Sequence, residues 1–339
     1  MRIGLNPHKD KLQKESDYLH QIIIPVYIPN QEGYFKESFK IFKLCVTSLL
    51  NTIHDKTFVT IVNNGSAKEI KEYLDELHDE KKIHEVIHTQ NIGKLNAILK
   101  GLSGNTIELV TISDADVLFL SNWQSETIKV FKTIPNAGVV GIVPQFKMYE
   151  TNCGTLLFDN FFNKNLKFIP IKNKNALVRF YDSIGWDRNY NHDYLKFGLG
   201  LQVNDLKVFV GSGHFVATYK KDMFQEIKTF IGYKLGGDSE TYLDVAPLKN
   251  GYWRVTTYDN YASHLGNAWE NWMDEISFDQ QQNDYVDYNF KVNKKSNSIA
   301  YFIKNRLFIK FISIKWIVKL FFKWKGLPKQ LIQNYNDIN

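Results

Sequence analysis

Two aspartates one residue apart, Asp114 and Asp116, directly follow an apolar run of strand length at 109–112. Carboxylates this close repel each other, so keeping both ionised at the end of a strand requires a compensating cation. Hard oxygen ligands on a short loop suit Mg²⁺ or Mn²⁺, and these metals commonly accompany a phosphorylated substrate. A polar turn after a buried strand would also use Asp, and this segment alone leaves both interpretations open.

The segments around the aspartates alternate between patterns typical of strands and of helices. Ser66 with Glu69 predicts a capping box at the start of one of these helices. This alternation predicts an α/β fold, an open sheet of mostly parallel strands flanked by helices. The expected strands cover 21–29, 57–62, 83–87, 109–112 and 137–143, and the expected helices cover 38–50, 66–77, 96–102 and 123–134.

Polar segments follow several of the expected strands. Pro29 and the segments 63–66, 91–94 and 114–116 all lie at or beyond strand ends. Ligands of open α/β sheets bind beyond the carboxyl ends of the strands, so we expect these segments on one rim. Neither a P-loop nor Gly-x-Gly-x-x-Gly follows any of these strands, which argues against a kinase or a dinucleotide-dependent dehydrogenase.

Four segments, in this order, resemble the GT-A fold inverting glycosyltransferases of family 2, which use nucleotide-sugar donors. The resemblance covers about residues 20–270 and implies a Rossmann-like GT-A sheet. Ile24-Pro-Val-Tyr27 is similar to the family's opening strand and loop, Val62-Asn-Asn-Gly-Ser66 to its Val-Asp-Asp-Gly-Ser segment, Asn91-Ile-Gly-Lys94 to its Asn-x-Gly-Lys/Arg element, and Asp114-Ala-Asp116 to its Asp-x-Asp metal motif.

The resemblance implies a set of donor-binding residues, namely Pro25, Tyr27, Asn63, Asn64, Asn91, Lys94 and Asp114. The sequence departs from the family at the second loop, where Asn63 and Asn64 replace the usual paired aspartates. An Asn oxygen can accept the same hydrogen bond from a nucleotide base without the charge, so we expect a UDP-sugar donor. A turn that uses Asn-Gly for its left-handed backbone explains Asn64 equally well.

The resemblance also implies a catalytic base and a further metal ligand. Asp238 is similar to the aspartate of the family's Glu-Asp element at the start of a helix, with Glu240 as the alternative. Inverting transfer needs one base to take the acceptor proton, although Asp238 would also suit an N-cap. In several GT-A enzymes a C-terminal His completes the metal shell, and His264 matches that element. The resemblance therefore implies that Asp116, Asp114 and His264 hold Mn²⁺ or Mg²⁺.

Two regions of the C-terminal half carry weaker signals. Residues 145–210 mix polar and aromatic side chains, for which we expect a surface insertion. Residues 208–218 have the pattern of a strand, a Gly-rich bend and a strand, and His214 within them is expected to be structural. We therefore expect a GT-A domain over 1–290, with a nucleotide-sugar-binding half at about 20–145 and an acceptor-side half at 146–290.

The positive charge is concentrated at the C-terminus. The 339 residues carry a net charge of +6, but 291–339 hold 11 Lys/Arg and one acidic residue, which leaves −4 for the body. An acidic body argues against a protein that coats nucleic acid. Between 299 and 325, basic and aromatic residues alternate, and no uncharged run reaches the ~20 residues of a spanning helix. We expect a C-terminal amphipathic helical extension with a bend near Ser313.

This basic extension fits the surface of an anionic membrane, and packing as a helical pair on the body or on a partner subunit is the alternative. Two cysteines without a disulfide framework and the absence of a signal-peptide pattern favour the cytoplasm, at the inner face of the cell membrane. The expected activity is metal-dependent inverting transfer of a hexosyl or N-acetylhexosaminyl group to an acceptor hydroxyl, on a lipid-linked or surface polysaccharide precursor. A sugar-phosphate nucleotidyltransferase and a non-catalytic membrane-bound sugar-binding protein are the alternatives.

Overall fold

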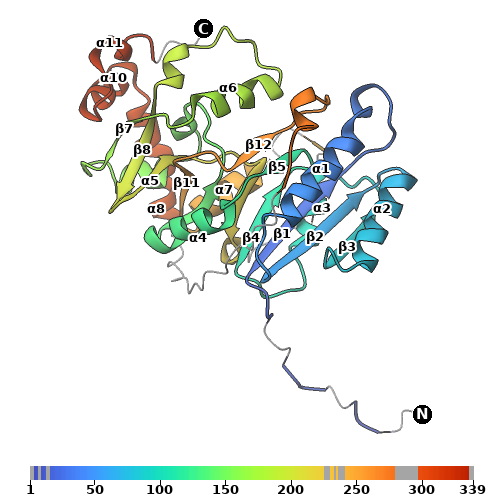
Figure 1. Cartoon of the computed structure of the whole chain (residues 1–339). Coiled ribbons are helices and arrows are strands. Elements are labelled where there is room, and N and C mark those ends of the chain that lie inside the picture. The colour runs from blue at the N-terminus through green and yellow to red at the C-terminus, as the bar shows by residue number, and fades with distance from the viewer. Residues whose placement is uncertain are drawn as a thin grey trace.

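The computed structural model describes residues 4–6, 9–12, 16–224, 230–232, 234–235, 241–278 and 297–335. Within these ranges, ten strands form one sheet in the order β3-β2-β1-β4-β10-β6-β11-β9-β8-β7 (Figure 1). Their bounds are β1 His20–Val26, β2 Thr57–Asn64, β3 Glu85–Thr89, β4 Leu109–Ser113, β6 Ala137–Gly141, β7 Leu166–Pro170, β8 Phe197–Val203, β9 Leu206–Val210, β10 Val216–Lys220 and β11 Trp253–Thr257.

Most strands of this sheet point the same way. Strands β3, β2, β1, β4, β6, β11 and β8 run in one direction, and β10, β9 and β7 run in the opposite one. The expected mostly parallel α/β sheet is therefore confirmed. The helices of the body are α1 Ser38–Leu50, α2 Lys68–Asp79, α3 Lys94–Gly101, α4 Trp123–Thr133, α5 Gly154–Asp159, α6 Lys174–Ser183 and α7 Thr241–Lys249.

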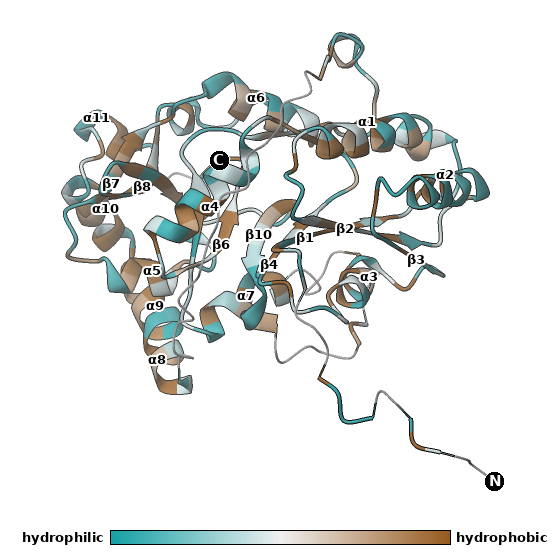
Figure 2. Ribbon diagram, turned by 60° about the horizontal axis from the view of Figure 1, so that its bottom comes forward, coloured by the Kyte–Doolittle hydropathy of each residue, from teal (hydrophilic) through white to brown (hydrophobic). Residues whose placement is uncertain are grey.

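The central strands are buried because helices cover both faces of the sheet. Along β1, Ile22 and Ile24 share an apolar cluster with α1 and α2, whereas Ile23 belongs to a cluster with α3 and α7. This alternation is the two-residue period of a strand. Because β1, β2 and β4 are parallel, the loops that follow them lie at one rim of the sheet (Figures 1 and 2).

The observed boundaries lie within a few residues of the expected ones, but the predicted capping box is wrong. Helix α2 has Ala67 at its N-cap, and no side chain caps it. The Ser66 hydroxyl instead accepts from Ile28 N at 3.0 Å and donates to Val26 O at 3.2 Å. A tertiary contact with the end of β1 therefore replaces the local cap.

The C-terminal extension is helical and bends where expected. Helix α9 ends at Ile312 and α10 begins at Lys315, on either side of Ser313. None of the described helices is long and apolar enough to cross a bilayer. One side of α10 joins the apolar core of the body, so packing on the body is confirmed for that side. The extension consists of α8 Ser298–Phe302, a π-helical turn Ile303–Leu307, α9 Phe308–Ile312, α10 Lys315–Trp324 and α11 Lys329–Ile332.

A buried polar network ties the start of β1 to its neighbours. His20 Nε2 lies 2.6 Å from Thr111 Oγ1 on β4, and Gln124 Nε2 on α4 lies 3.0 Å from His20 Nδ1. Because the Gln124 amide donates, Nδ1 accepts and Nε2 carries the proton, which is the neutral imidazole. Burial, followed by the proximity of His54, lowers the pKa of His20 to about 3.

We expect this network to make the protein sensitive to acid. The unfolded His20 takes up a proton near pH 6.5 and the folded one only near pH 3. Its contribution to stability is therefore complete above pH 6.5 and is lost as the pH falls, by up to about 1.4 kcal/mol per pH unit. Urea unfolding between pH 7 and pH 4 measures this slope. His20→Gln should flatten it, whereas His78→Gln at an exposed helix position should not; equal slopes in both variants would exclude His20 as the cause.

Candidate functional site

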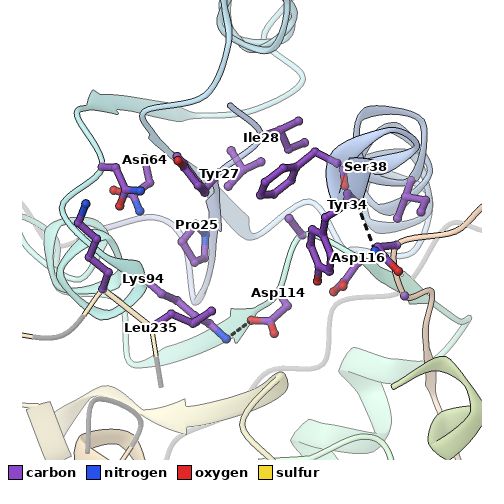
Figure 3. A pocket seen from close by; sticks show the side chains of 18 residues that line it. Pro25, Tyr27, Ile28, Tyr34, Ser38, Asn64, Lys94, Asp114, Asp116 and Leu235 are labelled. Atoms are coloured by element: carbon purple, nitrogen blue, oxygen red, sulfur yellow. Dashed lines mark hydrogen bonds and ion pairs between the residues drawn. The ribbon is translucent and has the colours of Figure 1, made fainter. Parts of the chain in front are cut away.

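A cavity of about 440 Å³ opens at the carboxyl ends of β1, β2 and β4. The structure brings seven of the predicted site residues together on its wall (Figure 3). These are Pro25, Tyr27, Asn64, Asn91, Lys94, Asp114 and Asp116. The sequence segments that carry them span 92 positions, from 25 to 116, and meet only because parallel strands end at the same rim.

Asp114 is held in place by its backbone and by a lysine. Its N–H donates to Phe215 O at 2.7 Å, just before β10. Lys94 Nζ, at the start of α3, lies 2.6 Å from Asp114 Oδ1, as the dashed line in Figure 3 shows. Asp114 is therefore held in a fixed position on the wall of the cavity, paired with the Lys94 ammonium.

The Oδ1 atoms of Asp114 and Asp116 are both buried without a hydrogen bond within the described chain, but only that of Asp114 has an ion pair, with Lys94. Burial raises the pKa of Asp116 to about 6, against the opposing effect of His264, and Asp114 raises it further. A buried anion of this kind requires either a proton or a cation. The donor set at this end of the cavity is therefore suited to a divalent metal.

His264 is brought to Asp116 by a second, two-stranded sheet. Strand β5, Val117–Phe119, pairs antiparallel with β12, Ala262–His264, and His264 lies opposite Val117. The His264 Nε2 atom is 3.5 Å from Asp116 Oδ2. Its Nδ1 atom accepts from Gly266 N at 3.2 Å and lies 3.0 Å from Ser183 Oγ. An Nδ1 atom that accepts from Gly266 leaves the imidazole proton on Nε2, facing Asp116. Binding of a cation at Nε2 would move the proton to Nδ1, where the Ser183 hydroxyl, which donates to Phe180 O, could accept it in place of the bond from Gly266.

No three His, Cys, Asp or Glu side chains of the described chain converge closely enough to form a metal site by themselves. Magnesium and similar ions are commonly held by one or two carboxylates plus the phosphates of a substrate. Asp114, Asp116 and His264 fit that incomplete type of site, with a diphosphate supplying the remaining oxygens.

The second loop uses its asparagines in a different way from the one expected. Asn63 does not line the cavity; its Oδ1 accepts from Ser66 N at 2.8 Å, and its Nδ2 lies 3.0 Å from His88 Nδ1. Asn64 lines the cavity, but its Oδ1 accepts from Ile92 N at 2.9 Å. The side-chain oxygens of both residues therefore order the loop. Because they already accept hydrogen bonds from the backbone, they are not free to accept one from a nucleotide base, contrary to the expectation from the sequence.

Gly65 allows the second and third loops to touch. Its φ is +88°, and an added Cβ would lie 2.7 Å from Asn91 N. Gly104 has a similar φ of +91° with nothing within 4 Å of the added atom. Both substitutions by Ala carry the strain of a left-handed backbone, about 1–2 kcal/mol, but only Gly65→Ala adds a backbone clash.

We therefore expect Gly65→Ala to lower the free energy of unfolding by roughly 2 kcal/mol more than Gly104→Ala does. It should also weaken nucleotide binding, because Asn91 must move. Urea denaturation and nucleotide titration of the two variants measure both effects. Equal losses in the two variants would show that contact between the loops is unimportant.

The predicted base, Asp238, and its alternative, Glu240, lie outside the described residues. The nearest described residues before them are Lys234 and Leu235, which line the cavity, and Lys234 O accepts from Lys94 N at 2.9 Å. The chain therefore enters the segment of Asp238 from the wall of the cavity. Sequence reasoning missed both residues, together with Tyr34, Phe35, Ser38, Gly266 and Asn267.

A buried ion pair underlies the Gly-rich bend before β10. Arg254, which is 2% exposed, donates through Nη2 to Ser212 O at 2.6 Å and to Asp244 Oδ1 at 2.5 Å. This pair ties α7 to the bend, and His214 Nδ1 lies 4.0 Å from Asp244 Oδ2. The sequence offers no local signal for it, because its partners belong to separate elements.

Residues 145–210 are part of the sheet and its cover, so the expected surface insertion is wrong for most of them. They supply β7, β8, β9, α5 and α6. The Tyr181 ring stacks on Phe146 at 3.9 Å and on Trp186 at 4.7 Å. Ser183, at the end of α6, reaches His264. The segment therefore supports His264 in its position beside Asp116.

Comparison with known proteins identifies the family. Residues 22–224 match the family described as "Glycosyl transferase family 2", and the chain belongs to it. The expectations of a family 2 glycosyltransferase and of a GT-A type fold are thus confirmed. No curated protein sequence matches the chain.

Solved structures with a similar fold include two glycosyltransferases. One is S. aureus TarS 1–349 in complex with UDP-GlcNAc, with 12% identity, a TM-score of 0.44, and coverage of 76% of this chain and 61% of that one. Another is the mannosyltransferase PcManGT from Pyrobaculum calidifontis in complex with GDP-Man and Mn²⁺, with 17% identity, a TM-score of 0.41, and coverage of 75% and 59%. The chain thus spans about 60% of the length of these structures.

Proposed function

We propose that this protein is a metal-dependent inverting glycosyltransferase that moves a sugar from a UDP-sugar to an acceptor hydroxyl. The observation that carries the proposal is the buried Oδ1 of Asp116, which has no hydrogen bond within the described chain, beside the Asp114 carboxyl that Lys94 holds in place. Two carboxylates on the wall of a cavity, with a histidine 3.5 Å from one of them, are suited to holding a cation against a diphosphate. Family membership supports sugar transfer over the two alternative activities.

In this proposal, Asp116, Asp114 and His264 hold Mn²⁺ or Mg²⁺. The ion would supply electrophilic stabilisation of the charge that develops on the leaving diphosphate. Lys94 orients the Asp114 carboxyl through their ion pair. Tyr27, which packs edge-on against Phe35 at 5.9 Å, offers an aromatic wall for the base. Asn64 and Asn91 border the nucleotide from the second and third loops.

Asp238 takes the proton from the acceptor hydroxyl as that oxygen attacks the anomeric carbon. Attack from the face opposite the diphosphate inverts the configuration, and no covalent enzyme intermediate is needed. The C–O bond to the acceptor forms while the bond to the diphosphate breaks, and the proton goes to the Asp238 carboxylate. A hexosyl or N-acetylhexosaminyl group is the proposed cargo, and a lipid-linked or surface polysaccharide precursor at the inner face of the cell membrane is the proposed acceptor.

Thermal denaturation with nucleotides and metal tests the donor half of this proposal. UDP with Mn²⁺, each at a large excess over its dissociation constant, should raise Tm by about 3–5 °C, whereas UDP alone or GDP with Mn²⁺ should raise it much less. Equal stabilisation without metal would exclude the metal site, and a preference for GDP would exclude uridine. A chain that responds to no nucleotide would overturn the proposal.

Product analysis separates the alternatives. Metal-dependent release of UDP from a UDP-sugar is expected of the transferase. Release of pyrophosphate from UTP and a sugar phosphate would instead identify a nucleotidyltransferase. Absence of both products, in a protein that still binds a sugar, would identify a non-catalytic binding protein.

A further inference from the structure

Helix α10 has three distinct faces. Phe321 and Phe322 are buried in the core of the body, and Ile317 is buried beside them on the same helix. On the other half of the helix, three lysines and three large apolar residues each recur every four positions, and residues spaced in this way lie in one row along a helix. The lysine row is Lys315, Lys319 and Lys323, and the apolar row is Trp316, Leu320 and Trp324.

The apolar row is exposed although the helix already has a buried face. Trp316 is 63% exposed, Leu320 55% and Trp324 50%. Phe321 and Phe322 already pack the helix on the body, so the fold does not require the burial of these three side chains. Two tryptophans and a leucine in one solvent-facing row are a costly arrangement for an isolated surface, since each exposes apolar area to water.

The preceding helical segment repeats the pattern. From α8 through the π-helical turn to α9, exposed apolar residues again recur every four positions. Arg306 and Lys310 lie beside them and are also exposed. Figure 2 shows α8, α9 and α10 in succession along one flank of the molecule. The apolar residues of this second row are Ile299, Ile303, Leu307 and Phe311.

The body of the protein extends this surface. Phe162, after α5, is 83% exposed, and its ring lies 6.0 Å from that of Trp324. Phe158 of α5 is also exposed, and its ring lies 5.3 Å from that of Phe308. The extension is therefore not a separate arm. We name as the aromatic–basic flank the two exposed apolar rows of the extension, the basic residues beside them, and Phe158 and Phe162 of the body.

The charge of the flank indicates what it meets. Residues 297–335 contain no Asp or Glu. Of the seven basic residues between 299 and 325, Lys304 pairs with Asp159, and Lys325 donates to Phe161 O and Asn163 O. The other five, Arg306, Lys310, Lys315, Lys319 and Lys323, form no ion pair within the described chain.

We infer that the aromatic–basic flank docks on an anionic lipid bilayer and holds the body in one orientation on it. Tryptophan and phenylalanine enter the boundary between headgroups and acyl chains, while flanking lysines extend to the lipid phosphates. A second copy of this chain fits less well, because two such flanks face to face would bring like charges together. Since the inner side of α10 is part of the core, the membrane holds the whole domain rather than a tether.

Vesicle sedimentation tests this inference with the full chain. The probes are vesicles of phosphatidylcholine alone and of an equimolar mixture of phosphatidylcholine and phosphatidylglycerol. The wild-type protein should sediment with the mixed vesicles and much less with the neutral ones. The triple variant Lys315→Gln, Lys319→Gln, Lys323→Gln should bind the mixed vesicles about 100-fold more weakly, at about fivefold per lysine. Trp316→Ser with Leu320→Ser should also lose binding.

Matched controls use the opposite edge of the sheet. Lys68, Lys71 and Lys100 are exposed lysines on α2 and α3, next to β3 and β2 rather than β7. Their triple replacement by Gln changes the net charge equally, and Trp186→Ser removes another exposed tryptophan. Neither control should change vesicle binding, and circular dichroism melts verify that every variant folds.

Three results would overturn the inference. They are a wild-type protein that stays in solution with the anionic vesicles, flank variants that bind as tightly as the wild type, and a control triple that loses as much binding as the flank triple. Analytical ultracentrifugation adds another: if Trp316→Ser with Leu320→Ser converts a dimer to a monomer without affecting lipid binding, the flank is a subunit interface. Vesicle binding does not depend on sugar transfer. A protein without transferase activity could therefore still bind vesicles, and an active transferase could fail to bind them, so the two proposals are tested separately.

Discussion

Replacing Asp116 by Asn should reduce sugar transfer by about 1,000-fold or more. The substitution keeps the size of the side chain and removes the negative charge that would attract the cation. The Oδ1 atom of Asp116 is a buried carboxylate oxygen that has neither a hydrogen bond nor an ion pair within the described chain, so we expect it to be a ligand of the cation. UDP binding in the presence of Mn²⁺ should weaken in parallel, while binding without metal should change little. Calorimetric titration and an assay of UDP release measure the two effects.

Asp205→Asn is the matched control for this experiment. Asp205 is an exposed aspartate in the turn between β8 and β9, far along the sheet from β4. The same chemical change there should leave transfer and metal-dependent binding at wild-type levels. If Asp116→Asn transferred sugar as fast as this control, the carboxylate pair would be a structural turn and the metal site would be refuted.

Replacing Asp238 by Asn should lower transfer by about 100- to 10,000-fold and leave the donor site intact. A general base acts on the acceptor hydroxyl and makes no contact with the diphosphate. The Tm increase produced by UDP with Mn²⁺ should therefore equal that of the wild type. In the sequence, Asp238 follows Lys234 and Leu235, which line the cavity.

Glu240→Gln is the comparison that separates the two candidate bases. If Asp238 is the base, Glu240→Gln should retain most of the transfer rate. The reverse pattern would assign the base to Glu240, and wild-type rates in both variants would show that neither carboxylate removes the acceptor proton. A loss of nucleotide binding in Asp238→Asn would instead place that residue in the donor site.

Much of the nucleotide half was predictable because its signals are local. The run before Asp114 is apolar and β-branched, and such runs form buried strands wherever helices cover both faces. Polar residues placed after four strands then had to share a rim, since parallel strands end on the same side. The cavity wall at Pro25, Asn91 and Lys94 follows from this rule.

The errors arose where a tertiary contact competes with a local pattern. Ser66 has the sequence context of an N-cap, but the end of β1 offers its hydroxyl two backbone partners. Asn63 matches a donor-binding position, yet its amide is used by Ser66 and His88. Residues 145–210 lack strong periodicity because their strands and helices are short. Their strands β7, β8 and β9 form the antiparallel edge of the sheet.

By itself, the sequence determined the alternation of strands and helices, the acidic pair at the end of β4, and the excess of basic and aromatic residues at the C-terminus. These are properties of neighbouring residues, and hydrophobic periodicity is enough to reveal them. Only the tertiary structure decided that Asp116 Oδ1 is buried without a hydrogen bond, that Arg254 and Asp244 meet in the interior, and which side of α10 is buried. Each of these depends on residues distant in the chain, whose contacts arise only when the whole core packs.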